Sequence, residues 1–280
     1  MVAGEGSGVQ RLLLIYGGLA LLAAWVLVPF AWMVMSSIKT TEEVTRVPIV
    51  YLPEHPTLDN YAILLAVSSF PRQFMNSAFV SIVTAILSVA LAAFAGYGLS
   101  RFRFTGAGLI ETFILVTQMF PGVLLIVPYS VIIAQLGLFN TYPALIIAYT
   151  SFALPFSTWM LKGFFESIPR ELDEAAMVDG CSRLRAFVAV IVPVSLPGIV
   201  ATIIFSFILA WNEFLFALAL TRTESMYPVT VGIASFVGQF RISYEMIMAA
   251  SVVATVPTVI LYMLLEKYLV QGLTAGAVKA

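Results

Sequence analysis

The chain has 280 residues, of which 61% are hydrophobic and 10% are charged, and its mean hydropathy is +1.00. Soluble domains are usually about 45–50% apolar, so this composition excludes them and indicates an integral membrane protein. The net charge of −1 provides no basic stripe for phosphates, so no nucleic-acid partner is expected. His55 and Cys181 are the only residues of their types, which excludes an internal disulfide and a Cys/His zinc site. We predict no metal site and no catalytic residue.

The first apolar run, residues 12–35, contains no charged residue. A helix needs about 20 apolar residues to cross the hydrocarbon core of a membrane. A cleaved signal peptide is the competing interpretation, but its apolar region would be roughly 7–15 residues long and followed by an A-x-A-like site. The run is longer and no such site follows, so we interpret it as a retained first span.

Five further apolar runs follow, and runs of this length favour helices, because lipid satisfies no backbone groups. The sequence therefore predicts an all-α integral membrane protein with six transmembrane helices in a single domain, residues 1–280. The predicted spans are 12–35, 77–100, 109–134, 142–162, 191–220 and 247–266.

Lys and Arg residues predict the orientation, because cytoplasmic loops carry an excess of them. With both termini in the cytoplasm, the inner segments hold nine basic residues and the outer segments hold five. The inner residues are Arg11, Arg101, Arg103, Lys162, Arg170, Arg183, Arg185, Lys267 and Lys279, and the outer ones are Lys39, Arg46, Arg72, Arg222 and Arg241. This orientation places the loop 166–190 in the cytoplasm.

Several predicted spans contain residues that bend helices or bring them close together. Proline removes a helix hydrogen bond and bends the axis. Such bends occur in ordinary helix packing and also beside a substrate pathway, and we weigh these two roles about equally. Ala92 and Gly96 have the small-xxx-small spacing that lets two membrane helices approach closely. The bending residues are Pro121, Gly122, Pro128, Pro155 and Pro257.

The most polar stretch, "IPRELDEAAMVDG" (168–180), carries four acidic residues. Its pattern predicts a short helix with Pro169 in the first turn, acidic side chains near the positive end of the dipole, and Gly180 as a left-handed stop. Ser182 is a candidate cap for a second helix. That second helix has a predicted apolar face made of Leu184, Phe187, Val188 and Ile191. A solvated loop helix without a partner is the alternative for a bare charge run.

The residues of this stretch match a known pattern. "EAAMVDG" (174–180), nine residues and then "VIVP" (190–193) resemble the EAA loop of bacterial ABC importer permeases, with Val190 and Val192 where the pattern prefers Ile and Leu. The segments "PTLDNY" (56–61), "NS" (76–77), "WNEFLFAL" (211–218) and "VQGLTAGAVK" (270–279) resemble the smaller six-span subunit of maltose-type, carbohydrate-uptake permease pairs.

The resemblance implies a type I ABC importer transmembrane domain in a bacterial inner membrane. It implies a heterodimer with a second permease subunit, an ATPase dimer that carries ATP and Mg²⁺, and an extracytoplasmic sugar-binding protein. The EAA helix would couple the spans to the ATPase. The chain has no G-x-x-x-x-G-K-[ST] loop, so we expect a transport subunit and no enzyme. The expected coupling residues are Glu171, Glu174, Ala175, Ala176, Asp179 and Gly180.

Polar residues within the apolar runs are candidates for the substrate pathway, because polar groups inside a membrane normally face a cavity or a partner. Gln118, Trp211, Asn212 and Glu213 combine hydrogen-bonding groups with aromatic surface, which suits a sugar. Helix–helix hydrogen bonding is the alternative role. The substrate also stays open: oligosaccharide, monosaccharide, polyol or glycerol phosphate. An ion-driven secondary transporter would account for six spans but would leave the EAA loop unexplained.

Overall fold

The computed structural model describes residues 5–238 and 242–275, which fall into two compact units. The first unit comprises Met1–Ser68 with Ile233–Ala254, and the second comprises Ser69–Gly232 with Thr255–Ala280. Within the described residues the regular structure is helical, apart from an isolated bridge between Val237 and Ile242. The all-α prediction is therefore confirmed.

The first unit begins with the long helix α1 (Glu5–Ser37), followed by α2 (Thr41–Thr45) and α3 (Asp59–Ala66). Its apolar stretch, residues 11–37, contains an 18-residue window with a mean hydropathy of 2.2, and none of that window is buried within the chain. The end of α1 is joined to α3 through Asn60, whose amide donates to the carbonyl oxygens of Ser37 and Lys39, both at 2.8 Å. The unit also holds the first part of α14 (Tyr244–Ala275).

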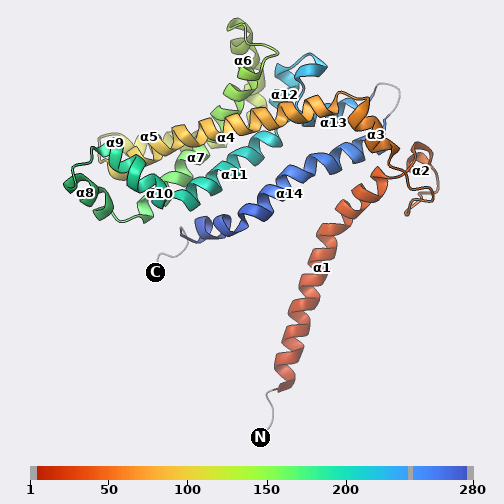
Figure 1. Ribbon diagram of the computed structural model, residues 1–280, viewed down its shortest axis with the longest axis horizontal. Coiled ribbons are helices and arrows are strands. Elements are labelled where there is room, and N and C mark those ends of the chain that lie inside the picture. The colour runs from red at the N-terminus through yellow and green to blue at the C-terminus, as the bar shows by residue number, and fades with distance from the viewer. Residues whose placement is uncertain (1–4, 239–241, 276–280) are drawn as a thin grey trace. The chain divides into compact units, whose positions relative to one another are not determined.

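Three helices form the centre of the second unit: α4 (Phe70–Arg101), α7 (Tyr142–Ser167) and α11 (Leu196–Trp211), which pack side by side (Figure 1). The contact face of α4 consists largely of small side chains. Ala92 is fully buried, and a Cβ atom on Gly96 would lie 2.9 Å from the backbone nitrogen of Lys162 in α7. The close approach predicted from the Ala92-xxx-Gly96 spacing is confirmed.

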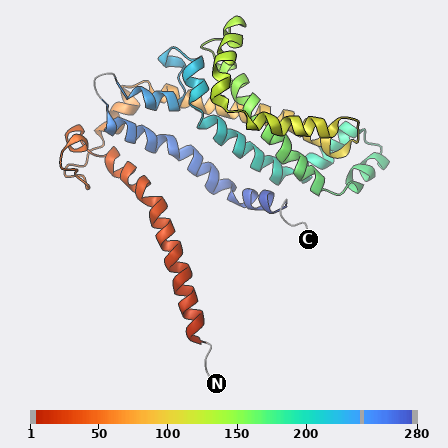
Figure 2. The same ribbon diagram turned by 180° about the vertical axis from the view of Figure 1, so that it is seen from behind.

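The predicted runs 109–134 and 191–220 are each interrupted. The first forms α5 (Ala107–Met119) and α6 (Gly122–Gln135), whose axes differ by 99°. The break lies at Phe120 and Pro121, where Phe120 has an extended backbone, as steric clash with a following proline favours. Figure 2 shows the side of the second unit on which α5 lies along α7.

Before the second interrupted run lie α9 (Arg183–Ala186) and most of the π-helical η1 (Phe187–Ile191), and the run itself starts with the last residue of η1 and with α10 (Val192–Val194). These pieces meet α11 at a 79° bend. The run ends in α12 (Leu215–Leu220), and η2 (Glu224–Met226) and α13 (Val229–Ser235) follow. By length and composition, four described helices are able to cross a membrane, or up to six if each bent pair counts as one span.

The contact between α4 and α7 gives a test of the fold. Gly96→Ala is expected to destabilise the chain by about 1–3 kcal/mol, the usual range for overpacking, because the added methyl meets backbone atoms that cannot rotate away. Gly98→Ala is the matched control, since a Cβ on Gly98 meets nothing within 4 Å. The midpoint of thermal unfolding in detergent measures both variants, and equal midpoints would contradict close packing at Gly96.

Candidate coupling site

The acidic stretch folds as the sequence predicts, into a helix, a glycine turn and a second helix. Helix α8 (Glu171–Val178) has Asp179 as its C-cap and is followed by Gly180, whose φ of +87° is left-handed. The N–H of Cys181 donates to the carbonyl of Ala176 at 3.0 Å, which is the closing bond of a Schellman motif. The hydroxyl of Ser182 then accepts from the N–H of Arg185 and caps α9.

Two details of the prediction are wrong. Pro169 lies one residue before Arg170, the N-cap of α8, and not within the first turn. The second helix buries only half of its predicted apolar face: Phe187 and Ile191 are buried, but Leu184 and Val188 are 62% and 54% exposed. The α-helical spacing behind the prediction does not hold from Phe187 to Ile191, because the π-helical turn of η1 has a different rotation per residue. Leu184 lies before this turn, in α9.

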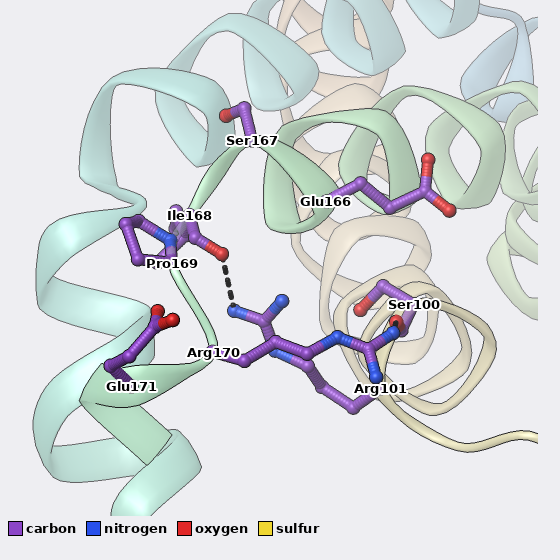
Figure 3. A pocket seen from close by; sticks show the side chains of 8 residues that line it. All are labelled: Ser100, Arg101, Glu166, Ser167, Ile168, Pro169, Arg170 and Glu171. Atoms are coloured by element: carbon purple, nitrogen blue, oxygen red, sulfur yellow. Dashed lines mark hydrogen bonds between the residues drawn. The ribbon is translucent and has the colours of Figure 1, made fainter. Parts of the chain in front are cut away.

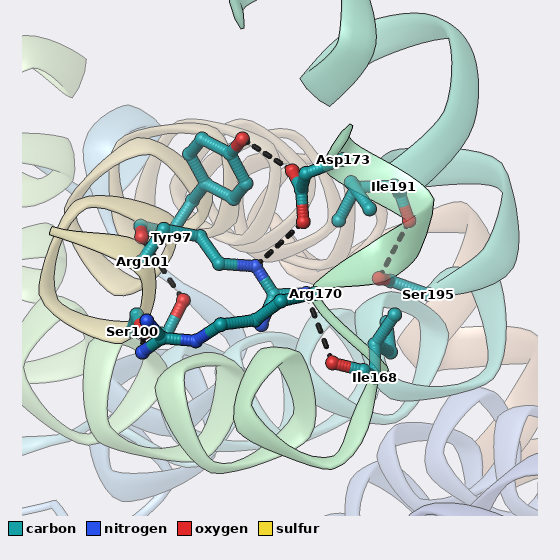
Figure 4. Close-up of polar contacts among 8 residues, drawn as sticks. All are labelled: Tyr97, Ser100, Arg101, Ile168, Arg170, Asp173, Ile191 and Ser195. Atoms are coloured by element: carbon teal, nitrogen blue, oxygen red, sulfur yellow. Dashed lines mark hydrogen bonds and ion pairs between the residues drawn. The ribbon is translucent and has the colours of Figure 1, made fainter. Parts of the chain in front are cut away.

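The inner face of α8 is fixed to the end of α4 by a buried ion pair. The guanidinium Nε of Arg101 lies 2.8 Å from Oδ2 of Asp173, and the two side chains are only 6% and 11% exposed. The hydroxyl of Tyr97 donates to Oδ1 of the same carboxylate at 2.6 Å. We call Tyr97, Arg101 and Asp173 the latch (Figure 4). Oδ1 of the buried carboxylate is thus hydrogen-bonded, and Oδ2 faces the charge of Arg101, although this second contact lacks hydrogen-bond geometry. The nearby opposite charge is what a buried carboxylate requires.

Two further hydrogen bonds, one from each side, join the end of α4 to the segment that precedes α8. Arg101, at the end of α4, donates through Nη2 to the carbonyl of Ile168 at 3.1 Å. Arg170, which precedes α8, donates through Nη2 to the carbonyl of Ser100 at 3.0 Å. Figure 3 shows the small pocket between these segments, with both arginines running along it. Its lining residues are Ser100, Arg101, Glu166, Ser167, Ile168, Pro169, Arg170 and Glu171.

Aromatic packing surrounds the latch. The ring of Tyr97 lies 4.5 Å from that of Phe187 in η1 and 6.1 Å from that of Phe165 in α7, measured between centroids. The guanidinium of Arg183 lies 5.3 Å from the ring centroid of Phe102. Segments α4, α7, α8 and η1 therefore converge on one aromatic cluster. This packing limits the access of water to the ion pair and strengthens its attraction.

The outer face of α8 is exposed to solvent within this chain. Glu171, Glu174, Ala175 and Val178 are all exposed, Val178 to 87%. Of the six coupling residues predicted from the sequence, Ala176 alone is buried, at 6% exposure, while Asp179 and Gly180 lie exposed in the turn. Helix α8 thus has one face fixed to the bundle and one face free.

None of the three residues of the latch was predicted from the sequence as part of the coupling site. A signal for Asp173 was present, because it lies three residues before Ala176 and so shares its helical face. No spacing in the sequence identifies Tyr97 and Arg101 as its partners, since they lie on a distant helix.

The predicted pathway residues have individual roles in the structure. Trp211 is buried between aromatic rings, stacked on Phe207 at 5.5 Å. Glu213 accepts the N–H groups of Phe216 and Ala217, both at 2.9 Å, and so caps α12. The side chain of Asn212 is exposed and donates to the carbonyl of Ile208. Gln118 lies exposed on a separate helix, α5.

Comparison with known proteins agrees with this architecture. Residues 88–275 match the family described as binding-protein-dependent transport system inner membrane component. The chain is 40% identical to the trehalose/maltose transport system permease protein MalG of Thermococcus litoralis, over 96% of this chain and 97% of that protein. It is 39% identical to the sulfoquinovosyl glycerol transport system permease protein SmoH of Agrobacterium fabrum, over 90% and 89% of the two chains.

A solved structure shares the fold. A chain of a bacterial ABC transporter involved in the import of the acidic polysaccharide alginate superposes with a TM-score of 0.82, at 22% identity, over 96% of this chain and 99% of that chain. The fold and the coupling segment define a transmembrane subunit of an ABC importer. The chain belongs to the binding-protein-dependent transport system inner membrane component family and is a multi-pass inner-membrane transport subunit.

The latch predicts how firmly α8 is held. Asp173→Asn keeps the shape of the side chain but leaves the buried guanidinium of Arg101 without a counter-charge, and breaking a buried pair in this way costs about 3–5 kcal/mol. We expect faster amide hydrogen exchange over residues 171–180 in the detergent-solubilised protein. Glu171→Gln, an exposed change on the same helix, is the control. Unchanged protection in Asp173→Asn would show that the ion pair does not hold the helix.

A variant of Glu213 distinguishes two roles of its carboxylate, capping of α12 and contact with the substrate. Glu213→Gln retains one acceptor oxygen for two N–H groups and is expected to destabilise the protein by about 1 kcal/mol, as loss of a cap does. Thermal unfolding and substrate affinity are measured together, with Glu224→Gln, at an exposed carboxylate in η2, as the control. Weaker substrate binding by Glu213→Gln at unchanged stability would assign the carboxylate to the substrate.

Proposed function

We propose that this chain is one of two permease subunits of an ATP-driven sugar importer, and that the outer face of α8 docks on a separate ATPase subunit. The observation that carries the proposal is the contrast between the two faces of α8. The inner face is held by a buried ion pair, whereas the outer face is fully available to a partner. A surface helix without a partner would have little need for a buried arginine to fix its orientation.

The latch connects the docked helix mechanically to the membrane-spanning helices, so that a displacement of α8 is transmitted to them. Asp173 lies between Glu171 and Glu174 in sequence, so a partner that moves the outer face also moves Asp173. The ion pair transmits that displacement to Arg101, at the end of α4, and α4 packs along α7 and α11. ATP and Mg²⁺ belong to the ATPase dimer in this proposal, and this chain supplies no catalytic group and no cofactor.

The names of the relatives support a sugar substrate. One relative is named for trehalose and maltose transport and another for sulfoquinovosyl glycerol transport. Both names describe glycosides, which favours an oligosaccharide or a related glycoside over a free polyol or glycerol phosphate. Asn212, with its exposed side chain, is the strongest pathway candidate among the four predicted residues. An extracytoplasmic binding protein would deliver the sugar, as the name of the family implies.

The exposure of α1 supports a second permease chain. The most apolar 18-residue window of α1 is entirely unburied within this chain, which leaves it available to lipid and to another helical subunit. The excess of basic residues in the predicted inner segments supports cytoplasmic termini and a cytoplasmic α8. An ion-driven secondary transporter is disfavoured, because it has no use for an ATPase docking helix.

Charge reversal on the outer face tests the docking proposal. Glu174→Lys is expected to reduce ATP-driven sugar uptake at least tenfold in proteoliposomes and to reduce co-purification of the ATPase subunit. The reason is that an exposed carboxylate facing the partner becomes a cation, while the latch on the opposite face is left intact.

Glu224→Lys is the matched control, because Glu224 is also exposed but lies outside α8, in η2. It should retain uptake and co-purification. Full coupling in Glu174→Lys, or equal loss in both variants, would contradict docking at this face.

A further inference from the structure

The first unit contains a group of side chains that the transport function does not use. Glu43, Glu54 and His55 each place one ligand-type atom so that the three atoms lie within 4.8 Å of one another. Glu43 belongs to α2, and the other two belong to the loop that follows it (Figure 1). All three lie in one compact unit.

Glu43 is the unusual member of this group, because its carboxylate is buried. The residue is only 5% exposed. Its Oε1 atom accepts the backbone N–H of His55 at 2.7 Å, which turns the carboxylate toward the segment that carries Glu54 and His55. Its Oε2 atom is buried and has no hydrogen-bond partner among the described residues.

A buried carboxylate oxygen without a partner destabilises the folded state, and a charged carboxylate requires a nearby cation or several hydrogen-bond donors. The nearby cations within the described residues are engaged elsewhere. The ammonium of Lys39 donates to the carbonyl of Val50 and lies 4.3 Å from the ring centroid of Trp32. Arg46 pairs with Glu54 at 2.8 Å and not with Glu43. Among the described residues, no lysine or arginine forms an ion pair with Glu43.

We propose that Glu43, Glu54 and His55 bind a divalent transition-metal ion of the Zn²⁺ type. One imidazole nitrogen and two carboxylate oxygens form a ligand set that suits Zn²⁺, with a fourth position open to water. The imidazole disfavours Ca²⁺ and Mg²⁺, which prefer oxygen ligands alone. This set differs from the Cys/His zinc sites that the composition excludes.

The Arg46–Glu54 ion pair does not prevent metal binding. Both of its side chains are 51% exposed, and exposed pairs contribute only about 0–1 kcal/mol. Glu54 is therefore free to exchange Arg46 for a metal ion at small cost. His55 is also exposed, so its ring is accessible to an incoming ion. A bound ion would join α2 to the loop segment that contains Glu54 and His55.

Zinc itself is the probe, used on the assembled transporter purified in detergent without any histidine tag and stripped of metal with EDTA. Equilibrium dialysis against Zn²⁺ should show one saturable site per chain. Both Glu43→Gln and His55→Ala should weaken it by at least about tenfold, since even groups that only orient a zinc ligand have effects of 10–100-fold. Glu42→Gln, an exposed neighbour on the same helix, should bind zinc like the unaltered protein.

The variants separate loss of a ligand from loss of the fold. Glu43→Gln retains an oxygen that accepts the N–H of His55 and removes an unpaired buried charge, so the thermal midpoint of the metal-free variant should be no lower than that of the unaltered protein. X-ray absorption at the zinc edge should show nitrogen and oxygen ligands only. Equal zinc binding in all variants, the absence of a saturable site, or a sulfur ligand from Cys181 would overturn the proposal.

Discussion

The ion pair between Arg101 and Asp173 is the constraint on which the coupling site depends. Because both side chains are nearly buried, neither charge is tolerated without the other, and this fixes the end of α4 against α8. The hydroxyl of Tyr97 and the backbone bonds of Arg101 and Arg170 leave little freedom around the pair. A short helix that would be marginal in water thereby becomes a rigid part of the bundle.

Rigidity at the latch would be of no use if the helices behind it slid independently. The α4–α7 contact provides the necessary stiffness through backbone proximity, since Gly96 leaves no space for even a methyl group against α7. Small residues of this kind drive packing in membranes, where burial of apolar surface gives no advantage over lipid. In the proposed coupling, a displacement of α8 would therefore reach a packed set of helices and not one flexible span.

The sequence was most informative where the structure is determined locally. Gly180 as a left-handed stop, Ser182 as a cap and the Ala92–Gly96 spacing all follow from short-range geometry, and the structure contains all three. The EAA resemblance likewise placed the coupling segment on one continuous stretch. Hydropathy alone did not reveal that the runs 109–134 and 191–220 are interrupted, because bent and straight helices are equally apolar.

The site residues that sequence reasoning missed or left undecided are those defined by tertiary contacts. Asp173 looks like one more charge of an acidic helix until Arg101 is brought to it from α4. Conversely, Glu213 stood out in sequence as a charge in an apolar run, yet its carboxylate is occupied by the N–H groups that open α12. In both cases the polar group stabilises the backbone geometry of this permease. An acidic residue in such a chain is therefore best interpreted first by what it bonds to within the bundle, and only then as a contact for ATPase or sugar.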